Sequence, residues 1–496
     1  MNLQEVARQS NSQYFRSTKS NLMREKGDLY EDKEMAANVK RYEAMKRKGE
    51  FAYFDVDEYL MIVDYYMQND MQNKAVEACE TALRVHGDTP ELVLKKAQIH
   101  VHQGKVRSAM KAILPLEPLL SDNYEFYLTK ASALLQMGKE EGFIECFQKA
   151  LELSQDVSPE EREDIFFGIG EMLENGQLYE PALQFYRVAS SEFPENIDFL
   201  FKIGICYENM GYAERGIEVY NKAIDIDPFS ESAWYNLGIA YNHVGDYDKA
   251  IEAYNYAIAL DPSFADAIFN KGNTCCNAGL HDQALECYNE YLRIYPNSVS
   301  AMCYVGECHL HLGNVDESER CFDNILKVFN DYADAWFGKG MVCCAKKDYD
   351  RAIESFKRTL AIDSEYETAW FQLGRIYTET DNLKEAIDAY EKSIELNKYD
   401  AVSWECLALA YSSVDEVDIA IVKLTEALDF LPDDSLLLYV IAGLQLCIGD
   451  TDSCVKNFRK AYKLNPELCE HFFNIVPKSK LPKEIKTICN KNNNNQ

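Results

Sequence analysis

A 34-residue spacing recurs along most of this chain, and it constrains the fold more strongly than any other feature. It is clearest between residues 231 and 264, where positions 4, 7, 8, 11, 20, 24, 27 and 32 of one unit hold Trp234, Leu237, Gly238, Tyr241, Ala250, Tyr254, Ala257 and Pro262. Position 8 is glycine in seven successive units, as Gly170, Gly204, Gly238, Gly272, Gly306, Gly340 and Gly374. A period of this length indicates a stack of similar supersecondary units.

Each unit is predicted to be a pair of helices. In residues 231–264 the first helix would run from about Ser232 to His243 and the second from about Asp248 to Leu260, with Pro262 ending the second. Small residues at positions 8 and 20 let the two backbones approach, while aromatic side chains fill the remaining space. Twelve units are predicted, with starts near Val56, Pro90, Tyr124, Glu163, Ile197, Glu231, Ala265, Val299, Ala333, Glu367, Ala401 and Ser435.

These starts divide the chain into five segments. We expect a mobile polar arm over 1–30, a capping helix over 31–55, three divergent units over 56–157, nine regular units over 158–468, and a C-terminal capping helix with a basic, Asn-rich disordered tail over 469–496. The regular segment begins with five inserted residues, 158–162, whose Ser-Pro-Glu-Glu start predicts a capping box and an early helix. A bend is expected at this insertion.

The pattern resembles the tetratricopeptide repeat. The resemblance depends chiefly on Trp234, Gly238, Tyr241, Ala250, Ala257, Pro262, Gly272, Gly340, Trp370 and Gly374. It implies an all-α fold, an α-solenoid of antiparallel helix pairs that forms a right-handed superhelix of about twelve repeats. It also implies that the first helix of each unit lines a concave surface through positions 2, 5, 6, 9, 12 and 13.

Applying these positions to the chain gives a candidate groove for a partner protein. The groove residues are aromatic, amide or acidic: Phe167, Phe201, Tyr235, Phe269, Phe337, Phe371, Asn236, Asn270, Asn273, Asp266, Glu307 and Asp334. A negative, aromatic wall favours a basic segment with interspersed apolar residues. The alternatives are that the rings only pack within the repeats and that the acidic side chains form a solvated face.

Charge and hydropathy exclude several other classes of function. The net charge is −31, and a body this acidic repels nucleic acid. The amino end lacks the apolar core of a signal peptide, and the longest apolar run, residues 436–444, is too short to cross a membrane. We therefore expect a cytoplasmic protein, and self-association is left open.

Cysteine usage indicates a reducing compartment. The sixteen cysteines include no Cys-x-x-Cys, and most fall within predicted helices. The pairs Cys275-Cys276 and Cys343-Cys344 occupy the same positions two units apart, which favours a structural slot over a metal site. No metal or cofactor is predicted.

The sequence offers no room for a catalytic domain outside the repeats, and it contains no nucleophile elbow or phosphate-binding loop. We therefore expect a non-catalytic scaffold or adaptor. One alternative is a regulatory subunit whose basic arm, from Arg8 to Lys48, folds into its own acidic groove. Another is a repeat protein that remodels a bound signalling protein.

Overall fold

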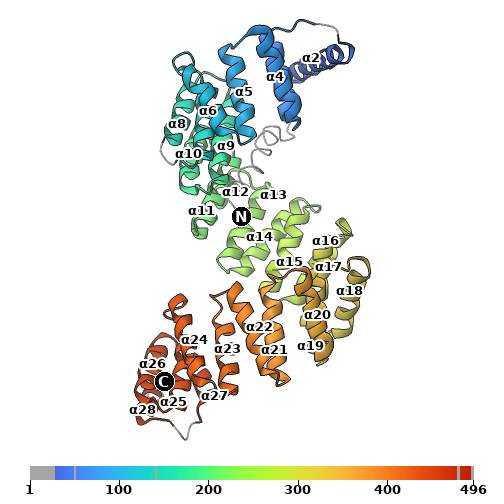
Figure 1. The fold of residues 1–496 in the computed structure, drawn as a ribbon. Coiled ribbons are helices and arrows are strands. Elements are labelled where there is room, and N and C mark those ends of the chain that lie inside the picture. Colours follow the sequence, from blue (N-terminus) through green and yellow to red (C-terminus); the bar gives the residue numbers. More distant parts are fainter. Residues whose placement is uncertain (1–27, 50–51, 140–141, 478–480, 493–496) are drawn as a thin grey trace. The chain divides into compact units, whose positions relative to one another are not determined.

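The computed structural model describes residues 28–49, 52–139, 142–477 and 481–492, and every regular element in them is a helix (Figure 1). The chain divides into two compact units, Met1–Ala267 and Ile268–Gln496, which are described separately below. Within each unit, successive helices pack against one another in antiparallel pairs. The fold is therefore an all-α solenoid.

The first unit begins with a single helix and continues with helix pairs. Its helices are α2 (Asp28–Lys48), α3 (Val56–Gln68), α4 (Gln72–His86), α5 (Pro90–His102), α6 (Val106–Ile113), a 3₁₀ helix (Leu114–Leu116), α7 (Tyr124–Gln136), α8 (Phe143–Leu153), α9 (Pro159–Asn175), α10 (Tyr179–Glu192), α11 (Asp198–Asn209), α12 (Ala213–Ile226), α13 (Glu231–His243) and α14 (Tyr247–Leu260). The prediction for the pair α13–α14 is confirmed to within one residue at either end of each helix.

The second unit repeats the same pattern. Helix α15 (Ala265–Asn277) spans the boundary and is followed by α16 (His281–Ile294), α17 (Val299–His311), α18 (Val315–Val328), α19 (Ala333–Ala345), α20 (Tyr349–Ile362), α21 (Glu367–Glu379), α22 (Leu383–Leu396), α23 (Ala401–Ser413), α24 (Val417–Phe430), α25 (Ser435–Cys447), α26 (Thr451–Leu464), a 3₁₀ helix (Pro466–Cys469), α27 (Glu470–Ile475) and α28 (Lys483–Asn492).

A glycine packed against a ring holds seven of the nine regular pairs together. Position 8 glycines contact the aromatic residue at position 24 of the same unit, and these rings are buried: Tyr186, Tyr220, Tyr254, Tyr288, Phe322, Phe356 and Tyr390. A Cβ added at Gly238 would lie 2.7 Å from Cε1 of Tyr254, and one at Gly340 would lie 2.6 Å from Cε1 of Phe356. Only glycine allows this approach.

The tryptophan side chains at position 4 form hydrogen bonds to the loop that connects their unit to the preceding one. The indole N–H of each donates a hydrogen bond to the carbonyl six residues earlier: Trp234 to Pro228 at 3.0 Å, Trp336 to Asn330 at 2.9 Å, Trp370 to Ser364 at 3.1 Å and Trp404 to Lys398 at 3.0 Å. The chain has four tryptophans, and all four make this bond. In these four units, the tryptophan at position 4 therefore holds the loop that precedes the first helix.

Helix α2 packs on the first helix pair. Tyr42 is 2% exposed, and the centroid of its ring lies 5.8 Å from that of Phe54 and 6.1 Å from that of Tyr59. Arg41 on the same helix pairs with Glu58 at 3.0 Å. The described part of the basic amino-terminal segment thus contacts the first repeat. Residues 1–27 of the expected arm lie outside the described residues.

The five-residue insertion lengthens α9 at its start. As predicted, the helix begins at Pro159, and Ser158 Oγ accepts a hydrogen bond from the Glu161 N–H at 3.1 Å. The expected capping box is incomplete, because the Glu161 carboxylate instead accepts a hydrogen bond from the Tyr124 hydroxyl. The insertion also supplies Arg162, which donates to the carbonyl of Leu151 at 2.9 Å and so ties α9 to the end of α8.

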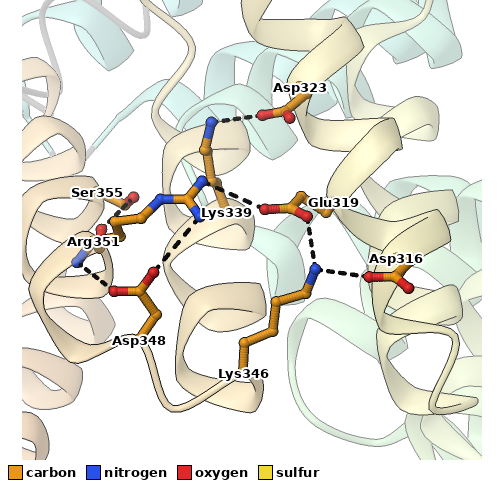
Figure 2. Close-up of polar contacts among 8 residues, drawn as sticks. All are labelled: Asp316, Glu319, Asp323, Lys339, Lys346, Asp348, Arg351 and Ser355. Carbon is orange, nitrogen blue, oxygen red and sulfur yellow. Dashed lines mark hydrogen bonds and ion pairs between the residues drawn. The ribbon is translucent and has the colours of Figure 1, made fainter.

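An ion-pair network joins α18 to the next pair, α19–α20 (Figure 2). Lys346 follows α19 and contacts Asp316 at 2.8 Å and Glu319 at 2.7 Å, both on α18. Glu319 also contacts Arg351 on α20 at 3.4 Å. Because one carboxylate serves two cations from two helices, the network fixes one repeat against its neighbour.

The C-terminal end contains a helix that the sequence analysis did not anticipate. Helix α28 buries Ile485 completely in a cluster with Phe458, Phe472 and Val476. Ile485 and Ile488 are three residues apart and form one apolar face. Part of the segment expected to be a basic tail therefore covers the last pair. Residues 493–496 lie outside the described part of the chain.

Candidate functional site

A pocket of about 250 Å³ opens on the first helices of three successive pairs in the first unit, α5, α7 and α9. Its apolar side is formed by Val101, Leu128, Ile165 and Met172. Its polar side is formed by Lys95, Gln98, His102, Tyr124, Glu125, Thr129, Ser132, Glu161 and Asp164. A cavity of about 150 Å³ can hold benzene. This pocket is therefore large enough for an apolar or aromatic side chain.

Most of these residues occupy the inward positions that the family resemblance implies. In the unit that starts at Tyr124, the lining residues Glu125, Leu128, Thr129 and Ser132 are positions 2, 5, 6 and 9. In the preceding unit they include positions 6, 9, 12 and 13. The positional rule therefore identifies the pocket wall, although the residues differ from the aromatic and amide types expected in the regular repeats.

A buried cation lies at one side of the pocket. The Lys95 ammonium contacts Asp64 at 2.8 Å, and its side chain is 13% exposed. Burial alone would lower the pKa of Lys95, but the carboxylates of Asp64 and Glu125 outweigh burial and raise it. Gln98 donates to Glu125 at 3.2 Å. The Lys95 ammonium and the Gln98 amide are thus each held in a fixed position by a carboxylate.

The opposite side of the pocket is negative. Asp164 is exposed on one side, but its partial burial, followed by the charges of Glu163 and Glu161, raises the pKa of its carboxyl to about 6. Within the described residues, no hydrogen bond or ion pair engages the Asp164 carboxylate. A cation placed there would relieve the repulsion among these three carboxylates. The pocket therefore combines an apolar floor with an anionic edge.

The predicted aromatic residues at position 5 are half-buried and pack against rings of their own repeat or of the next one. Phe167 stacks on Phe199 with centroids 4.2 Å apart, and Tyr235 lies 4.9 Å from Phe264. In the second unit the partners of the predicted rings are Tyr288, Tyr291 and Tyr304 for Phe269, Phe356 and Tyr366 for Phe337, and Tyr390 for Phe371. Phe201 packs in the cluster around Tyr220. For the buried part of each ring, these contacts favour the alternative that the ring packs inside the protein over the alternative that it binds a partner.

The predicted amide and acidic groove residues differ in their exposure and in whether they already form hydrogen bonds. Asn236 is half-buried and Asp266 is exposed. Asn273 accepts a hydrogen bond from Tyr288 at 2.7 Å and donates to Asn270 at 3.5 Å, so it is already engaged inside the protein.

Two of the predicted acids lie together in the second unit. Asp334 accepts a hydrogen bond from Tyr366 at 2.9 Å. Burial, together with the nearby Cys276 and Asp334, raises the pKa of Glu307 to about 7. The two carboxylates are therefore close enough to affect each other.

Some inward acids are neutralised by a neighbouring lysine. Lys202 on α11 contacts Glu174 at 3.0 Å and Glu171 at 3.4 Å, both on α9. The wall next to these residues is therefore less negative than the sequence suggests. The free carboxylate of Asp164 lies on the same helix, at its other end.

The described residues contain neither a candidate metal centre nor a candidate membrane span. Among the residues that the structure describes, no three His, Cys, Asp or Glu side chains come together as metal ligands would. In the same part of the chain, no helix has the length and the apolar character needed to cross a bilayer.

Comparisons with known proteins identify the repeat family. Sequence models described as tetratricopeptide repeat match residues 124–157, 197–230, 232–264, 269–319, 297–365 and 331–398. No curated protein sequence matches the chain.

Several solved structures are similar to parts of the chain. MamA is 28% identical over 34% of this chain and 92% of its own, with a TM-score of 0.31. Yeast Tom70 is 13% identical over 82% of this chain and 96% of its own, with a TM-score of 0.44. YrrB, whose structure is described as a TPR protein with an unusual peptide-binding site, is 20% identical over 38% and 96%, with a TM-score of 0.29. The recurring helix pairs and the residues that the sequence models match identify the family: this chain belongs to the tetratricopeptide repeat proteins and consists of about twelve tandem repeats.

Proposed function

We propose that the chain is an adaptor that captures a partner segment on the first helices of its repeats, and that this segment carries basic and apolar residues. Proteins built from these repeats act in general as interaction scaffolds that bind other proteins or peptides. The observation that supports the specific proposal is the pocket on α5, α7 and α9, whose apolar floor adjoins the unpaired carboxylate of Asp164. Burial of an apolar side chain supplies affinity, and the carboxylates select a basic neighbour.

The pocket can be tested with peptides of defined composition. We suggest short Gly/Ser peptides that carry one Phe and one Arg at varied spacing, compared with the same peptides carrying Glu in place of Arg. Binding to the full chain is measured by fluorescence anisotropy at low salt. We expect the Arg series to bind several-fold more tightly. Equal affinity for the Arg and Glu series would refute the charge selection.

Two variants and one control assign binding to the pocket. Ser132→Trp is expected to abolish binding because the indole fills the pocket that Ser132 lines. Asp164→Lys is expected to weaken the Arg series several-fold, since it reverses the charge at the anionic edge. Asp225→Lys makes the same charge change at an exposed site on α12 and should have little effect. An equal loss in Asp164→Lys and Asp225→Lys would indicate a general electrostatic effect and would refute the role of the Asp164 carboxylate.

The pH dependence provides an independent check. A bound cation favours the ionised form of Asp164, whose pKa in the free protein is about 6. Affinity for the Arg series should therefore rise as the pH increases through 6 and level off above 7. In Asp164→Asn the same titration should be flat. A profile in Asp164→Asn as steep as that of the wild type would contradict the assignment.

The groove residues predicted in the regular repeats can be tested in the same assay. Charge reversal at Asp266 or at Asp334 is expected to weaken binding at low salt if the partner extends along the first helices beyond the pocket. Affinity that stays unchanged in both variants would restrict the site to the pocket on α5, α7 and α9.

A further inference from the structure

Two cysteines in the second unit approach each other closely on the first helices of adjacent repeats. The Sγ atoms of Cys276 on α15 and Cys308 on α17 are 3.8 Å apart. Cys276 is half-buried, whereas Cys308 is 1% exposed. A small oxidant can therefore reach Cys276, while Cys308 is accessible mainly from Cys276.

The surroundings of Cys276 stabilise its thiolate. Hydrogen bonding from the Cys308 thiol lowers the pKa of Cys276 to about 6, against the opposing effect of burial and with help from Tyr288 and His281. The Tyr288 hydroxyl lies 3.7 Å from the Cys276 sulfur and 2.7 Å from Asn273 Oδ1. Its single proton points to Asn273 while Cys276 is a thiol and can turn to the sulfur once Cys276 ionises.

Other charged and titratable groups also face this pair. Glu307 on α17 is close enough for the Cys276 charge to raise its pKa, so it opposes the thiolate. The rings of His281 and His311 stack with centroids 4.4 Å apart. The pKa of Cys276 is lowered because its hydrogen-bond donors outweigh the opposing effect of burial, and Cys308 is the strongest of these donors.

We propose that Cys276 and Cys308 form an oxidant-sensitive thiol pair, in which a hydroperoxide oxidises Cys276 and Cys308 then closes an intramolecular disulfide. The Cys276 thiolate attacks one peroxide oxygen, the O–O bond breaks, and hydroxide leaves, which gives a sulfenic acid. The Cys308 sulfur then attacks the Cys276 sulfur, and the hydroxyl group leaves as water with the Cys308 proton. Overall, two thiols lose two electrons and the hydroperoxide is reduced.

The repeat architecture provides a matched internal control. Cys344 occupies position 12 of its unit, the same position as Cys276, and it is also half-buried. The residue at position 10 of the next unit is Ile376 instead of a second cysteine. Burial, with no neighbouring thiol donor on the next unit, raises the pKa of Cys344 to about 11. The surroundings of the two cysteines differ in the partner thiol and in two further groups, because Phe356 and Tyr349 stand where the unit of Cys276 has Tyr288 and His281.

A second thiol pair nearby serves as a further contrast. Cys275 and Cys287 hydrogen-bond to each other, but Cys275 is fully buried and Cys287 is 4% exposed. An oxidant in solution cannot reach either sulfur without local opening. We expect this pair to remain reduced when Cys276 and Cys308 are oxidised.

The proposal predicts two measurements on the reduced full-length chain. The first is alkylation by iodoacetamide at pH 7, resolved by peptide mass spectrometry; Cys276 is expected to react at least about tenfold faster than Cys344. The second is treatment with hydrogen peroxide, followed by alkylation and digestion. The expected main product is a Cys276–Cys308 cross-linked peptide that dithiothreitol reverses.

Serine variants separate the two steps. In Cys308→Ser, peroxide should leave a sulfenic acid on Cys276 that dimedone traps, and the cross-link should be absent. In Cys344→Ser, the cross-link should form as in the wild type. Alkylation of Cys276 no faster than that of Cys344 would overturn the proposal, and so would a peroxide product that joins Cys276 to another chain instead of to Cys308.

Discussion

Replacing Gly238 by alanine tests how the repeat core positions the inner wall. The new Cβ would lie 2.7 Å from Cε1 and 2.8 Å from Cδ1 of Tyr254. The Tyr254 ring is 1% exposed, so it has no free space to enter, and its centroid lies 6.0 Å from that of Tyr235. Relief of the clash must therefore spread α13 from α14 or move Tyr235, one of the predicted groove residues.

The expected size of the effect follows from two opposing contributions. Overpacking a core by one methyl group costs about 1–3 kcal/mol. Alanine in place of glycine inside a helix contributes about 1 kcal/mol of stability. We therefore expect Gly238→Ala to destabilise the pair α13–α14 by about 1 kcal/mol, which corresponds to roughly fivefold less protection from local opening.

Hydrogen–deuterium exchange with mass spectrometry measures this effect locally, which is preferable because long repeat arrays do not unfold in one step. Gly216→Ala on α12 is the matched control, because its nearest neighbours would be 3.5 Å from the new Cβ. That variant should slow exchange in α12, since it keeps the gain in helix propensity without a clash. Exchange in α13 and α14 of Gly238→Ala as slow as in the wild type would refute the packing argument.

Three further predictions concern stability. Burial raises the pKa of Glu307 from 4.5 to about 7, so native stability falls as the pH rises from about 4.5 to about 7 and levels off above it, and Glu307→Gln should raise the melting temperature much more at pH 8 than at pH 5. Lys346→Gln should lower the melting temperature at low salt, because it removes both ion pairs to α18, and the difference should shrink at high salt. Deletion of residues 1–50 should destabilise the chain because it uncovers the face on which Tyr42 packs, whereas deletion of 1–27, which keeps α2, should not; both are checked by thermal unfolding.

The periodic features of the fold could be predicted from the sequence because each repeat faces the same packing problem. Glycine recurs at position 8 in seven units and tryptophan at position 4 in four, since close helix approach and a hydrogen-bonded loop are needed in many units. Features that occur once escaped prediction. The helix that buries Ile485 is not part of a repeat, so the 34-residue pattern does not predict it. The approach of Cys276 to Cys308 depends on two different positions in two units.

The candidate site was predicted only in part. The inward positions implied by the family resemblance coincide with much of the pocket lining, but the sequence analysis applied them to the aromatic, regular repeats from Phe167 onward. The pocket lies mainly in the two preceding units, where Leu128 and Ser132 occupy positions 5 and 9. Applying the same positional rule to those units would have found them. The pKa of Asp164 could not be foreseen, because it depends on burial beside Glu163 and Glu161.

The divergence of the early repeats has a physical consequence for binding. In most regular repeats a ring at position 5 fills the inner wall, as Phe167 does by stacking on Phe199 with centroids 4.2 Å apart. In the unit that begins at Tyr124, the same position holds Leu128, and position 9 holds Ser132, so less side-chain volume is present and a pocket opens. The residues that make a repeat resemble its family are those that fill its own core. The unit that begins at Tyr124 still matches the family over residues 124–157, but the smaller side chains at these two positions leave space for a side chain of another protein, which is why we place the binding site there.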